Sequence, residues 1–127
     1  MSSDPIREEI VSGGKGSNMS GIGSLEAVIL SVLWDNDGKG TVRLVYEVLR
    51  EQRIIAYTTV MTVMNNLTKK GLLHQDKSKL AYSYTTVKPR NQLGYEVVST
   101  DLKKLCGQNK GAMESILMRA LQDLRAS

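Results

Sequence analysis

The stretch from Tyr57 to Gly71 restricts the fold of this chain more than any other. Its apolar residues recur at i, i+3, i+4 and i+7, a spacing that puts side chains on one stripe of an α-helix: Val60, Val63, Met64 and Leu67. A solvated helix face is usually rich in Glu, Lys and Arg, but small polar side chains occupy most of the outer face here. A helix that inserts into a DNA major groove and a surface helix with an uncharged face both fit this stretch taken alone.

The outer face of this helix has hydrogen-bonding groups near its start and a lysine near its end. A threonine methyl can pack on a thymine methyl, and its hydroxyl can reach a phosphate or a base edge. The residues that project together are Thr58, Thr62, Asn65 and Lys69, with Thr59, Met61 and Asn66 on the flanks.

Two further helices are predicted before this one. Ser24 is placed to cap a first helix that ends near Asp35, and Asn36 to Gly40 has the composition of a loop. Thr41 is then the expected N-cap of a second helix, which should stop near Gln52. Trp34 lies opposite the apolar stripe of the first helix, so we expect it to pack on the hairpin (the wing) that follows the third helix or on the C-terminal helices.

The hydrophobic period changes after Gly71, which can adopt the left-handed conformation favoured just past a helix end. Leu72 to Gln75 and Ala81 to Thr86 read as two short strands around a polar turn. Tyr82 and Tyr84 alternate with polar residues, and we expect both to cover the core side of this hairpin. Three helices and a basic hairpin predict a mainly α fold with a small β-hairpin, the winged helix-turn-helix.

The helical period returns after Pro89. A fourth helix is expected up to the segment Gly107 to Gly111, and a fifth from about Ala112 to Arg125. Neither is long enough to be stable alone in water, and a second copy of the chain is the simplest partner for their apolar faces. The residues expected to hold this homodimer are Val98, Leu102, Leu105, Met113, Ile116, Leu117 and Leu121.

This pattern predicts three parts. Residues 1–20, with three Gly and five Ser, are expected to be a flexible leader, residues 21–88 a winged-helix domain, and residues 89–127 a C-terminal helical dimerisation region. The leader is equally compatible with a native extension, a start assigned upstream of Met19, or an arm that orders on DNA.

The positive charge is concentrated in the middle of the chain. The net charge of the whole is +4, but the range from Lys39 to Arg90 contains ten basic and three acidic residues, or +7, and the remainder carries −3. This distribution is typical of a cationic module joined to flanks of lower charge, and it favours a polyanionic partner.

Several function classes are not expected. The single cysteine, Cys106, allows no intramolecular disulfide or CxxC motif and fits a reducing, cytoplasmic setting, where a thiol on an apolar helix face acts as a small hydrophobe. No apolar run is long enough for a bilayer span. His74 has no partner at metal-ligand spacing, and Gly38 to Gly40 is too short for a phosphate loop. No catalytic set is visible, so we expect neither an enzyme nor a metal or other cofactor.

Particular sequence strings resemble those of one family. Leu33-Trp34, TVRLVYEVLRE from Thr41 to Glu51, AYTTVMTVMNNLTKKGLL from Ala56 to Leu73 and AYSY from Ala81 to Tyr84 resemble the BlaI/MecI family of bacterial repressors. The resemblance runs from about Ser24 to Leu121. It implies a homodimeric winged-helix repressor of resistance or stress genes on a palindromic operator. It also implies that the third helix contacts DNA, at the matching positions Thr58, Thr59, Met61, Thr62 and Asn66.

Three departures from the family pattern alter what the resemblance implies. Many relatives carry Arg where this chain has Asn66, which moves the expected phosphate contacts to Lys69 and the wing. Relatives cut by a sensor protease have an Asn-Phe bond in the fifth helix, whereas this chain has Leu117-Met118-Arg119-Ala120, so any upstream sensor is unknown. Copper-responsive relatives have paired cysteines near the C-terminus, and Cys106 alone cannot supply such a site.

The sequence therefore predicts a sequence-specific repressor whose partners are double-stranded DNA and a second copy of itself. The alternative is a winged-helix protein-interaction module that does not read DNA, which the absence of a cationic residue at Asn66 favours. The full set of expected DNA contacts is Thr41, Arg43, Thr58, Thr59, Met61, Thr62, Asn65, Asn66, Lys69, Lys77 and Lys79.

Overall fold

The structure is a computed structural model that describes residues 21–127, so the predicted leader at residues 1–20 lies outside the described residues. The chain divides into two compact units, and the division falls between Leu93 and Gly94. The predicted boundary at residues 88 and 89 lies slightly before this point. Each unit is described separately below.

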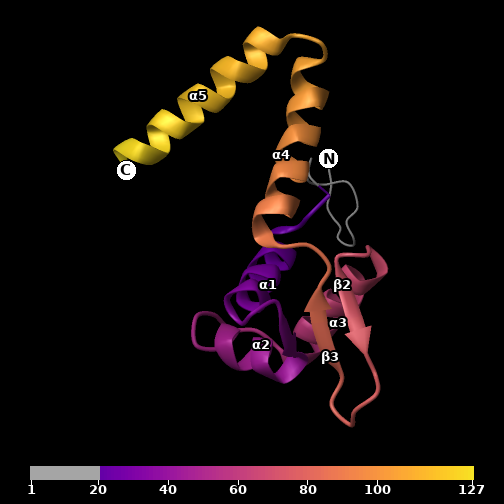
Figure 1. The fold of residues 1–127 in the computed structure, drawn as a ribbon. Helices are drawn as coiled ribbons and strands as arrows, with labels where there is room; N and C mark the ends of the chain where they lie inside the picture. Colours follow the sequence, from indigo (N-terminus) through magenta and orange to yellow (C-terminus); the bar gives the residue numbers. More distant parts are fainter. Residues whose placement is uncertain (1–20) are drawn as a thin grey trace, which may run out of the picture. The chain divides into compact units, whose positions relative to one another are not determined.

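The first unit has the winged-helix architecture that the sequence predicts (Figure 1). Its helices are α1 (Ser24–Asp35), α2 (Val42–Leu49) and α3 (Tyr57–Lys69), and its strands are β1 (Lys39–Thr41), β2 (Leu73–Asp76) and β3 (Ser83–Thr86). The strands form one antiparallel sheet in the order β1-β3-β2. We call residues 73–86, which comprise β2, β3 and the loop at 77–82 between them, the wing.

Strand β1 corrects the sequence prediction, which assigned residues 36–40 to a loop. Lys39 pairs with Thr85, and Gly40 with Tyr84. The backbone N–H of Thr86 also donates to the carbonyl of Gly38 at 2.7 Å. A three-residue strand is too short to show a period of two, so only its contact with the wing identifies it. The sheet therefore ties the wing to the start of α2.

Two helix ends also differ from the prediction. The N-cap of α1 is Gly23, and Ser24 is already helical; the Glu26 carboxylate accepts the Gly23 N–H at 2.8 Å in place of the expected serine cap. Helix α2 ends at Leu49, and hydrogen-bonded turns continue the chain to Arg53. The expected cap at Thr41 is confirmed, because its Oγ1 accepts the backbone N–H of Leu44 at 3.1 Å.

The core of this unit lies where the three helices meet the wing. Each helix contributes residues from one apolar stripe, and the wing and the start of helix α4 (Arg90–Cys106) close the cluster. Val63 of the predicted stripe is half-buried. The buried residues are Ile29, Leu30, Leu33, Val42, Val45, Leu49, Val60, Met64, Leu67, Leu73, Tyr84 and Leu93.

The two wing tyrosines have different environments. Tyr84 is 2% exposed, as predicted, but Tyr82 is 47% exposed, so the prediction that both cover the core was wrong for Tyr82. The reason is that β3 begins only at Ser83, and strand alternation does not extend into the loop before it. Instead the Lys77 ammonium lies 5.9 Å from the centre of the Tyr82 ring.

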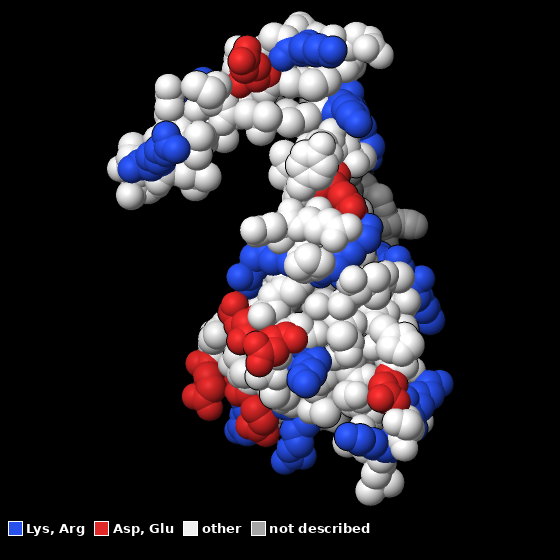
Figure 2. Space-filling model, viewed as in Figure 1, with Lys and Arg blue, Asp and Glu red and all other residues white. Residues whose placement is uncertain are grey.

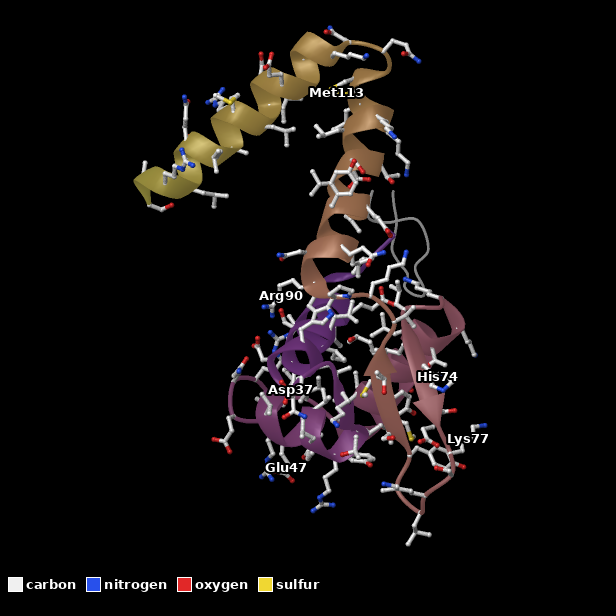
Figure 3. The ribbon with its side chains drawn as sticks, in the orientation of Figure 1. Asp37, Glu47, His74, Lys77, Arg90 and Met113 are labelled. Carbon is white, nitrogen blue, oxygen red and sulfur yellow. The ribbon has the colours of Figure 1, made fainter. Side chains whose placement is uncertain are left out.

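Trp34 contacts Lys88, just after the wing, and Arg90, the first residue of α4. Its indole N–H donates to the carbonyl of Lys88 at 3.0 Å. The Arg90 guanidinium, labelled in Figure 3, lies 5.3 Å from the centre of the Trp34 ring. It also contacts the Asp35 carboxylate at 3.0 Å. Trp34 thus fixes the chain to α1 just after it leaves the wing.

The second unit contains the rest of α4 (Arg90–Cys106) and α5 (Lys110–Ala126). Gly107 has a φ of +58° between the two helices, and Asn109 caps α5 by accepting the Ala112 N–H at 3.0 Å. Leu102 and Met113 are half-buried, and Cys106 is a half-buried free thiol. Helix α5 has no buried residue, and its apolar side chains are exposed by 44% at Ile116, 47% at Leu117 and 43% at Leu121. None of the described helices is long and apolar enough to cross a membrane.

Two glycines with the same backbone angle allow a stability test. Gly38 and Gly71 have φ values of +79° and +80°, but a Cβ at Gly71 would meet nothing, whereas one at Gly38 would lie 2.9 Å from the Thr86 Oγ1. Gly71→Ala should therefore cost only the backbone strain of about 1 kcal/mol. Gly38→Ala should cost at least about 1 kcal/mol more, because the Thr86 hydroxyl must move.

Urea denaturation of both variants measures this difference in the free energy of unfolding. The matched φ angles make Gly71→Ala the control for strain alone. Equal losses of stability in the two variants would contradict the assigned contact between residue 38 and Thr86.

Candidate nucleic-acid interface

Helix α3 presents its predicted polar face to solvent. Its inner stripe of Val60, Met64 and Leu67 is fully buried, so the other side of the helix must face outward. The exposed residues are Tyr57, Thr58, Thr59, Met61, Thr62, Asn66 and Lys69. The face combines hydroxyls, an amide, a thioether and one ammonium group, which suits hydrogen bonding to base edges and phosphate better than pairing with charges.

Both ends of α3 are fastened to the rest of the unit. The Lys70 ammonium donates to the Gly21 carbonyl at 2.7 Å and contacts the Glu26 carboxylate at 2.8 Å, which ties the end of α3 to the start of α1. At the other end, the Tyr57 ring packs edge-on against Tyr46 of α2, with centres 5.5 Å apart. These contacts fix the orientation of the exposed face before any ligand arrives.

A hydrogen-bond network joins α3 to the wing. The Tyr84 hydroxyl donates to the Asn65 Oδ1 at 3.0 Å. The Gln75 amide donates to the Tyr84 oxygen at 2.7 Å and to the Asn65 Oδ1 at 3.4 Å. Sequence reasoning missed this network, because helical spacing places Asn65 on the outer face without showing that it borders the wing. Asn65 is accordingly half-buried.

The wing loop carries the two predicted phosphate-binding lysines. Lys77 and Lys79 are exposed, and Leu80 between them and β3 is fully exposed. Figure 2 shows Lys and Arg side chains beside this loop, whereas acidic side chains gather on the side of α1 and α2, where Figure 3 labels Asp37 and Glu47. Lys and Arg side chains also lie among the acidic ones, so the positive charge on the face that is drawn extends beyond the wing (Figure 2).

Asp76 holds the first turn of the wing loop. Its Oδ1 accepts the backbone N–H of Ser78 at 2.8 Å. Hydrogen bonds from the Ser78 side chain and backbone lower the pKa of the Asp76 carboxyl, and the nearby charges of His74 and Lys79 lower it further. Hydrogen bonds to the charged form favour it, so this turn is best ordered while Asp76 is ionised.

The predicted contacts on α2 lie in a hollow between α2, α3 and the wing. This concavity has a volume of about 860 Å³, and Thr41, Arg43, Met61 and Asn65 line it together with exposed parts of Leu80 and Tyr82. The hydroxyl oxygen of Thr41 already caps α2. Arg43 is 4.0 Å from the Glu47 carboxylate, which Arg50 also contacts at 3.3 Å, so Glu47 offsets part of the local positive charge.

The other predicted residues lie outside this hollow. The threonines at 58, 59 and 62, with Asn66 and Lys69, are on the open face of α3, and Lys77 and Lys79 are on the wing loop. His74 projects from β2 and is exposed (Figure 3). Within residues 21–127 no group of three or more His, Cys, Asp and Glu side chains could hold a metal ion.

The fold and this surface define the class as a winged helix with a polar third helix and a basic wing. The family model of the penicillinase repressor matches residues 22–126, and the chain therefore belongs to that family. This result confirms the resemblance seen in the sequence.

Two curated relatives share part of the chain. Both are described as "Transcriptional regulator BlaI", from two strains of Mycobacterium tuberculosis, and each is 39% identical over 77 residues. Those residues are 61% of this chain and 56% of each relative, so the chain spans about half the length of the curated relatives it matches. The names are those of a repressor and of transcriptional regulators and not of enzymes, in agreement with the sequence analysis.

The Asp76 turn leads to a test by titration. Ser78→Ala should raise the pKa of the Asp76 carboxyl toward its ordinary value, because the Ser78 side-chain hydrogen bond lowers that pKa more than any other contact does. Since the pKa is depressed in the folded protein, the stabilisation of the loop is present above the unfolded pKa and is lost as pH falls through the folded pKa.

Carboxyl ¹³C NMR titration measures this pKa directly. Lys79→Ala is the matched control, because the charge of Lys79 is the smallest of the causes and its removal should raise the pKa less. An equal or larger rise in the Lys79→Ala variant would contradict the assigned order.

Proposed function

We propose that this chain is a sequence-specific transcriptional repressor that binds a palindromic DNA operator as a homodimer. The observation that carries the proposal is the exposed face of α3, which is uncharged over most of its length while Val60, Met64 and Leu67 on the opposite face are fully buried. A helix face that contacts only water does not require three threonines and a methionine at these positions. A face that inserts into a major groove has such a need, because it must pack on methyl groups and bond to base edges.

Discrimination between sequences is assigned to the open face of α3. Thr58, Thr59 and Thr62 can combine methyl packing on thymine with hydroxyl contacts to bases or phosphate, and Met61 and Asn66 flank them. Each good base contact is worth ~1–3 kcal/mol of discrimination. Asn66 supplies no charge, so phosphate contacts come from elsewhere.

Affinity that does not depend on sequence is assigned to the lysines. Lys69 lies at the end of α3, and Lys77 and Lys79 lie on the wing loop, where they can follow the phosphate backbone. Thr41 and Arg43 at the start of α2 are placed to add contacts at the edge of the hollow. Binding through such groups weakens with salt, because it releases counterions from the DNA.

Dimerisation is assigned to the second unit. After Leu93, the apolar side chains of α4 and α5 are half-buried or exposed in the single chain, and a second copy would remove them from water. The residues proposed for this contact are Val98, Leu102, Leu105, Met113, Ile116, Leu117 and Leu121. Two α3 helices would then read half-sites one helical turn, about 34 Å, or a multiple of it apart. Repression would be steric, by occupation of a promoter in the cytoplasm.

The alternative function is a module that docks a protein and does not read DNA. The observation in its favour is the apolar surface around the hollow, where Tyr57, Met61, Leu80 and Tyr82 are each exposed by at least 39%. The two functions differ in their response to salt. DNA affinity that falls steeply with salt supports the repressor, and no DNA binding at low salt supports the docking module.

The division of labour between α3 and the wing can be tested by two substitutions. Thr62→Ala should lower affinity for the selected operator by about fivefold or more and leave non-specific binding unchanged. Lys79→Ala should weaken binding to all DNA and reduce the salt dependence by about one phosphate contact.

Gel-shift titrations over a range of salt concentrations, with an operator first selected from a random DNA pool, measure both effects. Lys103→Ala, an exposed lysine of α4, is the matched control for loss of one positive charge. Unchanged operator affinity in both the Thr62 and Lys79 variants would rule out this docking arrangement.

Dimerisation can be tested separately in the second unit. Leu117→Asp should weaken self-association by tenfold or more, because it replaces burial of about 1.5–3 kcal/mol per leucine with a charge. Met118→Asp is the matched control, since Met118 is similarly exposed (54%) but lies off the apolar stripe of α5. Sedimentation equilibrium gives both association constants, and an equal effect of the two changes would contradict the proposed dimer face.

A further inference from the structure

The side chain of Asn65 is held in one orientation from the side of the wing. Its Oδ1 accepts two hydrogen bonds, from the Tyr84 hydroxyl at 3.0 Å and from the Gln75 amide at 3.4 Å. A carbonyl oxygen has two lone pairs, so this oxygen is fully used. Within residues 21–127 the Asn65 NH₂ group makes no hydrogen bond, and Asn65 lines the hollow beside α3.

The network runs in one direction, from Gln75 through Tyr84 to Asn65. Gln75 donates its amide N–H to the Tyr84 oxygen at 2.7 Å, which leaves the Tyr84 hydroxyl proton for Asn65. Tyr84 is 2% exposed, so its ring cannot turn away to bond with water. Rotating the Asn65 amide by 180° would set its NH₂ against the Tyr84 proton. The network therefore presents Asn65 to the hollow as a hydrogen-bond donor only.

A donor-only asparagine reads bases differently from a free one. A free asparagine recognises adenine with both ends of its amide, by accepting from N6–H and donating to N7. Asn65 has no acceptor to offer, so it lacks the first of these bonds. Guanine presents two adjacent acceptors in the major groove, N7 and O6, and cytosine presents a donor that would face the NH₂ group.

We propose that Asn65 selects a guanine and disfavours cytosine at one position of each half-site, and that Tyr84 and Gln75 are positioning residues that set this preference without touching DNA. This inference rests on the proposed function, since it needs α3 to lie in the major groove. It adds a base class to the site and assigns a role in specificity to two wing residues outside the predicted contact set.

The readout that separates positioning from support is the base preference. If Tyr84 only supported the core, Tyr84→Phe would weaken binding to every sequence by the same factor. If it orients Asn65, the loss of its hydroxyl frees the amide to rotate and accept from adenine. The preference for guanine over adenine should then fall about fivefold or more at one base pair and stay unchanged elsewhere.

The experiment uses the full chain and selection of bound sequences from a random duplex pool. Selected sites are then compared for the wild type and for Asn65→Ala, Tyr84→Phe and Gln75→Ala, with affinities measured on operators that differ at single base pairs. Gln75→Ala is the second positioning variant, because Gln75 is only half-buried and its loss leaves the core intact. Lys79→Ala is the control that should lower affinity without altering any base preference.

The inference requires Asn65→Ala to flatten the preference at one base pair where the wild type selects guanine, and Tyr84→Phe or Gln75→Ala to admit adenine there. It is overturned if Asn65→Ala alters no position, if the altered position selects adenine or cytosine in the wild type, or if neither positioning variant shifts the base preference. If the wild type selects no sequence at all, the proposed function itself fails, which is a result distinct from each of these.

Discussion

Burial of one stripe of α3 is the constraint on which the rest of this structure depends. Val60, Met64 and Leu67 are fully buried against α1, α2 and the wing, and a fully buried side chain of this kind is worth about 1.5–3 kcal/mol. Because this stripe makes the core contacts of α3, the residues of the opposite face are not needed for core packing and can be suited to binding a ligand. The threonines that would be unremarkable on an ordinary surface helix gain significance from this division between the faces.

A helix that recognises bases also needs a fixed orientation, and contacts at three points along α3 provide it. Tyr46 meets the first turn, Glu26 holds Lys70 just past the last turn, and Tyr84 bonds to Asn65 between them. Strand β1 adds an indirect restraint, because it ties the wing to the cap of α2. An error of about 1 Å in placing such side chains is costly for recognition, which is a physical reason for restraints from three different elements.

The sequence predicted those features that depend on local spacing. The three helices of the first unit, the cap at Thr41 and the left-handed Gly71 all follow from patterns within a few residues, and the structure has them. Features made by distant residues were missed. Strand β1 is defined only by its pairing with β3, which lies more than forty residues further along the chain. Helical spacing predicted the direction of the Asn65 side chain but could not show that Tyr84 lies beside it. The prediction for Tyr82 was wrong for a related reason, because side chains alternate between two faces only within a strand and β3 begins after Tyr82.

The modest positive charge of the chain gives a reason for dimerisation in the proposed mechanism. The middle segment carries +7, but Glu47 offsets Arg43 and Arg50, and Glu26 engages Lys70. In the proposed mechanism, Lys69, Lys77 and Lys79 then supply most of the phosphate contacts of one unit, and few phosphate contacts give only weak affinity at physiological salt. Joining two such units makes the second binding event intramolecular, which raises the overall affinity by orders of magnitude without any new contact. The exposed apolar side chains of α4 and α5 therefore fit a role in affinity as much as a role in assembly.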